Sequence, residues 1–189
     1  PDDLDSDADG DGLSNSNELA AGTDPYDAGS SSTMQFTVTK LQGKLDFKND
    51  ARDMLALAGV IPALPAGFDP RERTLSLNVG GALAVFTLDA KARSRLSDGS
   101  LQLKLKPSRR NATTRALEFL GGDVAFKALL KNGSFGGAWK DEGIDSSLST
   151  KNADVNFAIE LQFNGNVYAA IVPAGYSGKA GVGGKVRKR

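Results

Sequence analysis

The chain has 189 residues, 40% of them hydrophobic, with 23 acidic and 23 basic residues and a net charge of zero. This length allows one main domain with a small appendage. The absence of cysteine and histidine excludes disulfide bonds, thiolate metal sites and most catalytic triads and transition-metal centres. No run approaches the roughly twenty apolar residues that a membrane helix needs, so we expect no membrane insertion.

The charges are unevenly distributed along the chain. Residues 1–33 contain nine acidic residues and no lysine or arginine, so residues 34–189 carry the other 14 acidic and all 23 basic residues, a net charge of +9. We therefore predict an acidic segment over 1–29, a small polar linker over 30–33 and a main domain over 34–176. A basic, flexible tail is expected over 177–189.

The stretch DADGDGLSNSNE, residues 7–18, has the ligand order of an EF-hand calcium loop. Glycine at position 6 permits the turn around the ion, and the oxygen ligands are of the hard kind that Ca²⁺ prefers. A frame starting at Asp5 would end in Ser16, whereas the frame starting at Asp7 ends in a bidentate carboxylate. Positions 1, 3, 5, 7, 9 and 12 are Asp7, Asp9, Asp11, Leu13 (through its backbone carbonyl), Asn15 and Glu18.

The residues around this loop complete the predicted segment. A short helix over 17–21 is expected to end at Gly22, and Asp24-Pro25 is expected to turn the chain. No amphipathic helix precedes the loop, so it is half an EF-hand. Asp5, Asp24 and Asp27 are candidates for a second calcium site, although their spacing gives no complete ligand set. The alternative is a disordered acidic tail, which needs neither the glycine at position 6 nor the glutamate at position 12.

The whole stretch DSDADGDGLSNSNELAAGTDPYD resembles the thrombospondin type 3-like calcium-binding repeats of secreted bacterial proteins, and more distantly the dockerin repeat. The resemblance covers about residues 2–27 and implies an extracellular location. A dockerin has two such repeats, whereas this chain has one, so the resemblance does not extend to cohesin binding.

From residue 34 onward the hydrophobic pattern changes to a two-residue alternation. In VNFAIELQF, Val155, Phe157, Ile159, Leu161 and Phe163 share one face, which is typical of a half-buried strand. The same alternation occurs in MQFTVTK, KLDF, TLSLNV, LQLKLK and VYAAIV, while ALAVFTL suits a central strand.

Two dipeptides in this region predict tight hairpins. Gly80-Gly81 and Asn164-Gly165 each separate two predicted strands, and both tolerate the positive φ of primed turns. RALEFLGGDVAFKALLKNG would permit a helix, but its alternation favours strands. We therefore predict a mainly β fold, an antiparallel β-sandwich of immunoglobulin-like architecture, preceded by the small calcium-binding segment.

No catalytic constellation emerges from the sequence, and we expect no enzyme. A serine nucleophile would lack a histidine base, and the glycine pairs lack the context of a phosphate loop. Lys104, Lys106, Arg109 and Arg110 lack interleaved aromatic residues, so nucleic acid is not an expected partner. A glycosidase needs two facing carboxylates, and no spacing selects a pair among Glu72, Asp89, Glu118, Asp141, Glu142 and Glu160.

The function predicted from the sequence is that of an extracellular, calcium-binding structural or adhesive module in a larger surface assembly or filament. Its partners would be calcium and other protein subunits or copies of itself, for example through docking of the acidic segment on the basic body of the next copy. The alternative is a carbohydrate-binding module of a secreted enzyme, with Trp139, Tyr168 and Tyr176 stacking on polysaccharide. A lone tryptophan in a β-sandwich is more often a core residue.

Overall fold

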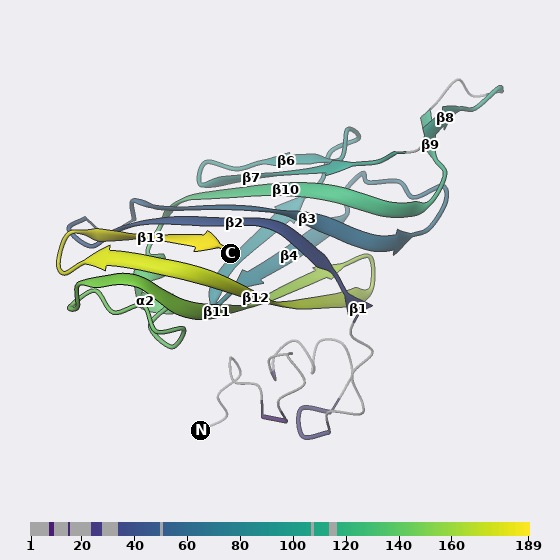
Figure 1. The fold of residues 1–189 in the computed structure, drawn as a ribbon. Helices are drawn as coiled ribbons and strands as arrows, with labels where there is room; N and C mark the ends of the chain where they lie inside the picture. The colour runs from purple at the N-terminus through teal and green to yellow at the C-terminus, as the bar shows by residue number, and fades with distance from the viewer. Residues whose placement is uncertain are drawn as a thin grey trace.

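The fold was analysed in a computed structural model, which describes residues 8–9, 15, 24–27, 34–49, 51–106, 108–113 and 117–189. Strands dominate the described part of the chain (Figure 1). In chain order the elements are β1 (Met34–Gln35), β2 (Thr37–Asp46), β3 (Asp53–Leu64), β4 (Thr74–Val79), β5 (Ala82–Thr87), β6 (Arg93–Arg95), β7 (Gly99–Lys104), β8 (Ser108–Arg110), β9 (Leu117–Phe119), β10 (Gly122–Gly133), α2 (Phe135–Ala138), β11 (Thr150–Phe163), β12 (Asn166–Lys179) and β13 (Gly183–Lys188).

One hydrogen-bonded path joins ten of these strands, in the order β5-β4-β11-β12-β13-β2-β3-β10-β7-β6. Every pairing along the path is antiparallel, and only the short β1 pairs in parallel, with β12. The sheet folds back on itself into a nearly closed structure whose two layers enclose the core (Figure 1). This confirms the mainly β, antiparallel class, with both layers belonging to one continuous sheet. β8 and β9 form a separate two-stranded sheet.

The two-residue alternation predicted from the sequence is present in the structure. In β11, Val155, Phe157, Ile159, Leu161 and Phe163 are all buried, from 0 to 6% exposed. The segment that also permitted a helix forms β9 and β10, as the alternation favoured. A helix there would have placed Phe126 on the face opposite Val124 and Ala128, whereas in β10 all three contribute to the core.

Both predicted hairpins are confirmed. Asn164 and Gly165, between β11 and β12, have φ values of 54° and 77°, and Gly80 and Gly81, between β4 and β5, have φ values of 54° and 84°. Positive φ at both central residues is what a type I′ turn requires, and its twist matches that of the flanking strands. Local sequence therefore determined the register of these two strand pairs.

Trp139 lies at the centre of the core. It is 0% exposed, and its indole Nε1 donates a hydrogen bond to the carbonyl of Val79 at 2.7 Å. Its ring stacks on Phe135 and meets Phe157 edge to face, with centroids 5.5 and 4.9 Å away. Gly43 of β2 leaves room for the indole, because an added Cβ there would lie 2.9 Å from it. Trp139 thus joins α2 to both layers.

The C-terminal segment differs from the sequence prediction. A flexible basic tail was expected over 177–189, but β12 continues to Lys179 and residues 183–188 form β13. β13 inserts between β12 and β2. Gly184 and Val186 face inward while Lys185 and Arg187 face outward. The many cations of this segment favoured a tail in the sequence, although its residues alternate as in a strand. Among the described residues, none of the helices has the length and apolar character needed to span a bilayer.

Candidate calcium-binding segment

The acidic N-terminal segment is described at a few positions. The first predicted calcium site is described at Asp9 and Asn15, and the second at Asp24 and Asp27. The other predicted ligands lie outside the described residues: Asp5, Asp7, Asp11, Leu13 and Glu18. The ligand set therefore stays a prediction, and the described residues show only whether the local backbone suits it.

Asn15 contacts the beginning of the predicted loop. Its side-chain oxygen accepts a hydrogen bond from the backbone N–H of Ala8 at 3.1 Å. These residues are positions 9 and 2 of the predicted loop, and the hydrogen bond brings these two positions together, as an ion-binding loop requires. The carboxylate of Asp9 and the amide of Asn15 are hard oxygen donors and fit Ca²⁺ chemically.

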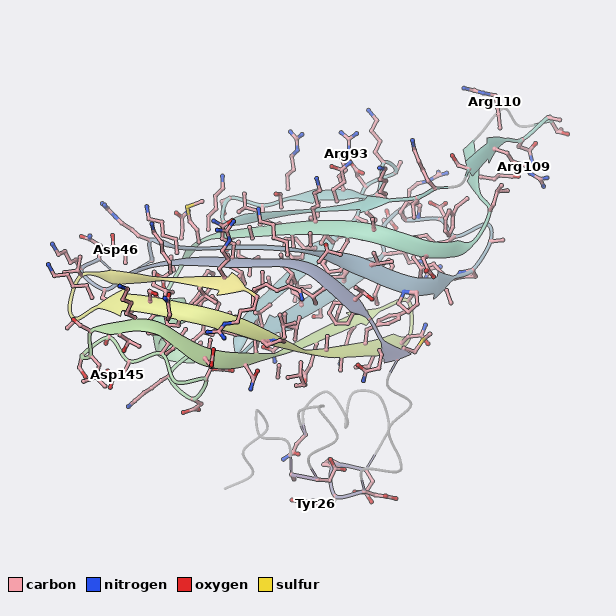
Figure 2. All side chains as sticks on the ribbon, viewed as in Figure 1. Tyr26, Asp46, Arg93, Arg109, Arg110 and Asp145 are labelled. Carbon is pink, nitrogen blue, oxygen red and sulfur yellow. The ribbon has the colours of Figure 1, made fainter. Side chains whose placement is uncertain are left out.

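Asp24 to Asp27 form the predicted turn. The backbone N–H of Asp27 donates to the carbonyl of Asp24 at 3.1 Å, and the N–H of Tyr26 donates to the Asp24 carboxylate at 3.1 Å. Pro25 occupies the second position, where its restricted φ suits a turn. The carboxylates of Asp24 and Asp27 thus belong to one turn, and Tyr26 between them is 77% exposed (Figure 2).

In the part of the chain that the structure describes, no group of three or more aspartate, glutamate, histidine or cysteine side chains converges on a point where a metal ion could bind. Calcium binding stays a prediction from the donor pattern of the N-terminal segment.

Several carboxylates of the main domain stabilise local structure. Asp53, 4% exposed, accepts hydrogen bonds from the backbone N–H groups of Asp46 at 2.7 Å and Gly136 at 3.0 Å, so it ties β2 and β3 to α2. Buried Glu160 accepts one from the side chain of Asn78 at 3.2 Å. The sequence gives no sign of this role of Asp53, because its partners lie 7 and 83 residues away along the chain.

Asp46, Asp53 and Asp145 also line a cavity of about 470 Å³ beside α2. Each of these carboxylates is occupied by hydrogen bonds from neighbouring groups. The side-chain amide of Asn49 lowers the pKa of Asp46, and the Ser147 hydroxyl lowers the pKa of Asp145. These aspartates order the turns that surround the cavity.

Glu142 has an unusual environment for a carboxylate. It follows α2 and lies over the Gly80-Gly81 turn, close enough that a Cβ built on Gly80 would be 2.5 Å from its Oε1. Burial raises its pKa from 4.5 to about 7, with a smaller contribution from the charge of Asp141. Its Oε2 accepts no hydrogen bond from any described residue. Glu142 is therefore sensitive to pH near neutrality.

The structure corrects the aromatic platform of the carbohydrate-binding alternative. Trp139, Tyr168 and Tyr176 are buried, at 0, 1 and 0% exposure. A ring must expose a face to stack on a sugar, and these three rings are packed in the core instead. The cations near residues 104–110 belong to different sheets, because Lys104 lies in β7 whereas Arg109 and Arg110 lie on the separate β8-β9 sheet (Figure 2).

Comparison with protein families finds one match. Residues 7–28 match the family model of the bacterial TSP3 repeat. The match begins at Asp7, the first position of the predicted ligand frame, and confirms the resemblance seen in the sequence. Such repeats are calcium-binding and typically extracellular. No curated protein and no solved structure matches the chain.

Proposed function

We propose that this protein is a non-catalytic extracellular module with a structural or adhesive role in a larger surface assembly, in which Ca²⁺ stiffens the N-terminal segment. The observation that carries this proposal is the agreement between the TSP3 match over residues 7–28 and a ligand frame that runs from Asp7 to Glu18. Spacing and family similarity select the same starting residue.

Repulsion among the carboxylates of the acidic segment explains why calcium would order it. Residues 1–33 carry nine carboxylates and no basic side chain, so the segment repels itself when no cation is bound. Binding of Ca²⁺ neutralises part of this charge and joins residues that are up to eleven positions apart, which couples ion binding to folding. Extracellular calcium would fill even a site with a Kd of about 10⁻⁴ to 10⁻³ M.

β1 attaches the segment to the main domain. Met34 and Gln35 pair in parallel with Tyr168 and Ala169 of β12, and the N–H of Phe36 donates to the carbonyl of Ala169 at 3.4 Å. Phe36 itself is buried in the core. Because the chain is held by the sheet from residue 34 onward, stiffening of residues 7–28 would leave the predicted linker, residues 30–33, as the joint between the segment and the sheet.

Calcium titration by calorimetry tests this proposal. We expect the wild-type chain to bind Ca²⁺ and the Glu18→Gln variant, which lacks the bidentate ligand at position 12, to bind about tenfold more weakly or worse. Small-angle X-ray scattering with calcium and with chelator should show a narrower distribution of dimensions when the site is filled.

Asp3→Asn is the matched control, because it removes one carboxylate from the same segment outside the ligand frame. Its affinity for calcium should stay within about twofold of the wild type, since a non-ligand charge acts only through screened repulsion. Equal weakening by both variants would show that calcium responds to total charge and not to a defined site. Absence of binding to the wild type would refute the proposal.

A further inference from the structure

The outer side of the layer β6-β7-β10-β3-β2 carries a regular array of cations. We call Lys40, Lys44, Arg93, Arg95, Lys127 and Lys131 the basic face; all six side chains are exposed. Arg93 is paired with Gln102, Gln102 with Lys127, Lys127 with Ala58, and Ala58 with Lys40. One row across five neighbouring strands therefore places a cation on every second strand, about 10 Å apart at the usual strand spacing.

The residues between these cations are small or uncharged. An open groove of about 420 Å³ runs over the face, with Ala56, Ala58 and Leu129 among its lining residues and Lys40, Arg93, Arg95 and Lys127 around them. Figure 2 shows the Arg93 side chain directed away from the sheet into solvent. The groove can therefore admit a chain-like ligand that lies close to the sheet and contacts cations on both sides.

The cations of this face are available to a partner. None of the three ion pairs among the described residues includes any of the six. Two acidic residues neighbour the face. Asp89 lies beside Arg93: its carboxylate accepts the backbone N–H groups of Lys91 and Arg93, at 2.7 and 2.9 Å, and the N–H and charge of Arg93 lower its pKa. Asp98 neighbours Lys131, because its backbone carbonyl accepts the Lys131 N–H at 2.6 Å. The six cations outnumber these acidic neighbours, so the face is net positive and attracts a polyanion.

The same chain contains a polyanion. Residues 1–33 carry nine acidic and no basic residues, and one bound Ca²⁺, with its charge of +2, would still leave a charge of −7. Asp3, Asp5, Asp7, Asp9 and Asp11 recur at every second position. A chain that carries a surface and its complement at different places associates heterologously, head to tail, and forms an open array unless the rotation closes.

We infer that the basic face is the docking surface for the acidic N-terminal segment of a second copy of this chain. The inference rests on the proposed structural role, since it names the partner through which such a module would assemble. Its readout is self-association, whereas that of the proposed function is calcium binding, so the two can fail separately.

Sedimentation velocity over a range of protein concentrations, in saturating calcium, tests the inference. The full-length wild type should associate, and association should weaken as salt is raised from about 0.05 to 0.5 M, because the Debye length shortens. The triple variant Lys40→Glu, Arg93→Glu, Lys127→Glu should associate about tenfold more weakly or worse, because it opposes like charges across the contact.

A second triple variant provides the matched control. Arg73→Glu, Lys140→Glu, Lys151→Glu changes the net charge equally at three exposed positions outside the basic face, and it should associate like the wild type. Equal weakening by both triple variants would overturn the inference, as would a wild type that stays monomeric. A monomeric wild type that binds an acidic polysaccharide through the basic face would also overturn it, and would assign the face to that ligand.

Discussion

At the scale of single residues, buried polar groups show how the main domain is held together. The Trp139 indole donates to Val79, and Asp53 accepts from two backbone N–H groups that belong to different elements. Buried hydrogen-bonding groups are costly when left unpaired. Glu142 differs, because its Oε2 has no hydrogen-bond donor among the described residues and burial raises its pKa to about 7.

The titration of Glu142 should be visible in the pH dependence of the free energy of unfolding. A carboxyl group whose pKa rises from 4.5 in the unfolded chain to about 7 in the folded chain favours folding in its protonated form. Its contribution is complete below about pH 4.5 and is lost as the pH rises through about 7. We expect Glu142→Gln to abolish this loss, so that urea unfolding finds the variant more stable than the wild type at pH 8 and similar to it at pH 4.5.

Asp141→Asn is the control for this measurement. Asp141 is exposed and makes the smaller contribution to the pKa of Glu142, so this variant should keep most of the loss of stability between pH 4.5 and 7. If Glu142→Gln and the wild type lose stability in parallel over that range, another group causes the dependence.

At the scale of elements, the strand joints illustrate the balance between local sequence and packing. The conformation of the Asn164-Gly165 turn is determined by its own two residues, because positive φ is accessible to both. β13 depends on its neighbours instead: a Cβ on Gly184 would lie 2.6 Å from the Tyr176 ring, so the strand fits only because glycine lets that ring close over it.

Substitution of Gly165, in the turn between β11 and β12, isolates the free-energy cost of its backbone conformation. Gly165 has φ of 77°, and an added Cβ would meet no atom within 4 Å. Gly165→Ala should therefore lower the free energy of unfolding by about 1 to 2 kcal/mol through backbone strain alone. Chemical denaturation measures the change.

Gly137→Ala is the complementary variant. Gly137 lies in α2, also has no atom within 4 Å of an added Cβ, and does not have a positive φ. Alanine there should be neutral or stabilising by up to about 1 kcal/mol. Equal destabilisation by the two variants would indicate a steric cost in place of the conformational one.

At the scale of the whole molecule, the net charge differs in sign between two parts of the chain: it is −9 over residues 1–33 and +9 over residues 34–189. The acidic residues that are predicted to bind calcium precede residue 34, whereas the buried cluster of the main domain runs from Phe36 to Val186. The nearly closed sheet encloses that cluster. We therefore expect the ion to act on the segment and not on the core.

Removal of calcium should leave the thermal unfolding of the main domain almost unchanged. A ligand stabilises the unit to which it binds, so we expect calorimetric scans with calcium and with chelator to agree in Tm within about 1 °C, less than a change of 1 kcal/mol would cause in a domain of this size. The near-UV signal of Trp139 should also be unaffected. A Tm shift of several degrees that is absent in Glu18→Gln would show that segment and sheet unfold as one unit.

The sequence by itself determined the features that depend on neighbouring residues. These are the mainly β class, the positive-φ hairpins, the Asp24-Pro25 turn and the TSP3-like spacing of oxygen ligands, because periodicity, turn chemistry and ligand order are all local. Only the tertiary structure decided the burial of Trp139, Tyr168 and Tyr176, the insertion of β13 between β12 and β2, and the alignment of Arg93, Lys127 and Lys40 in one row. These features arise from pairing between strands that are distant along the chain, and the alternation of a single strand does not specify which strand will lie beside it.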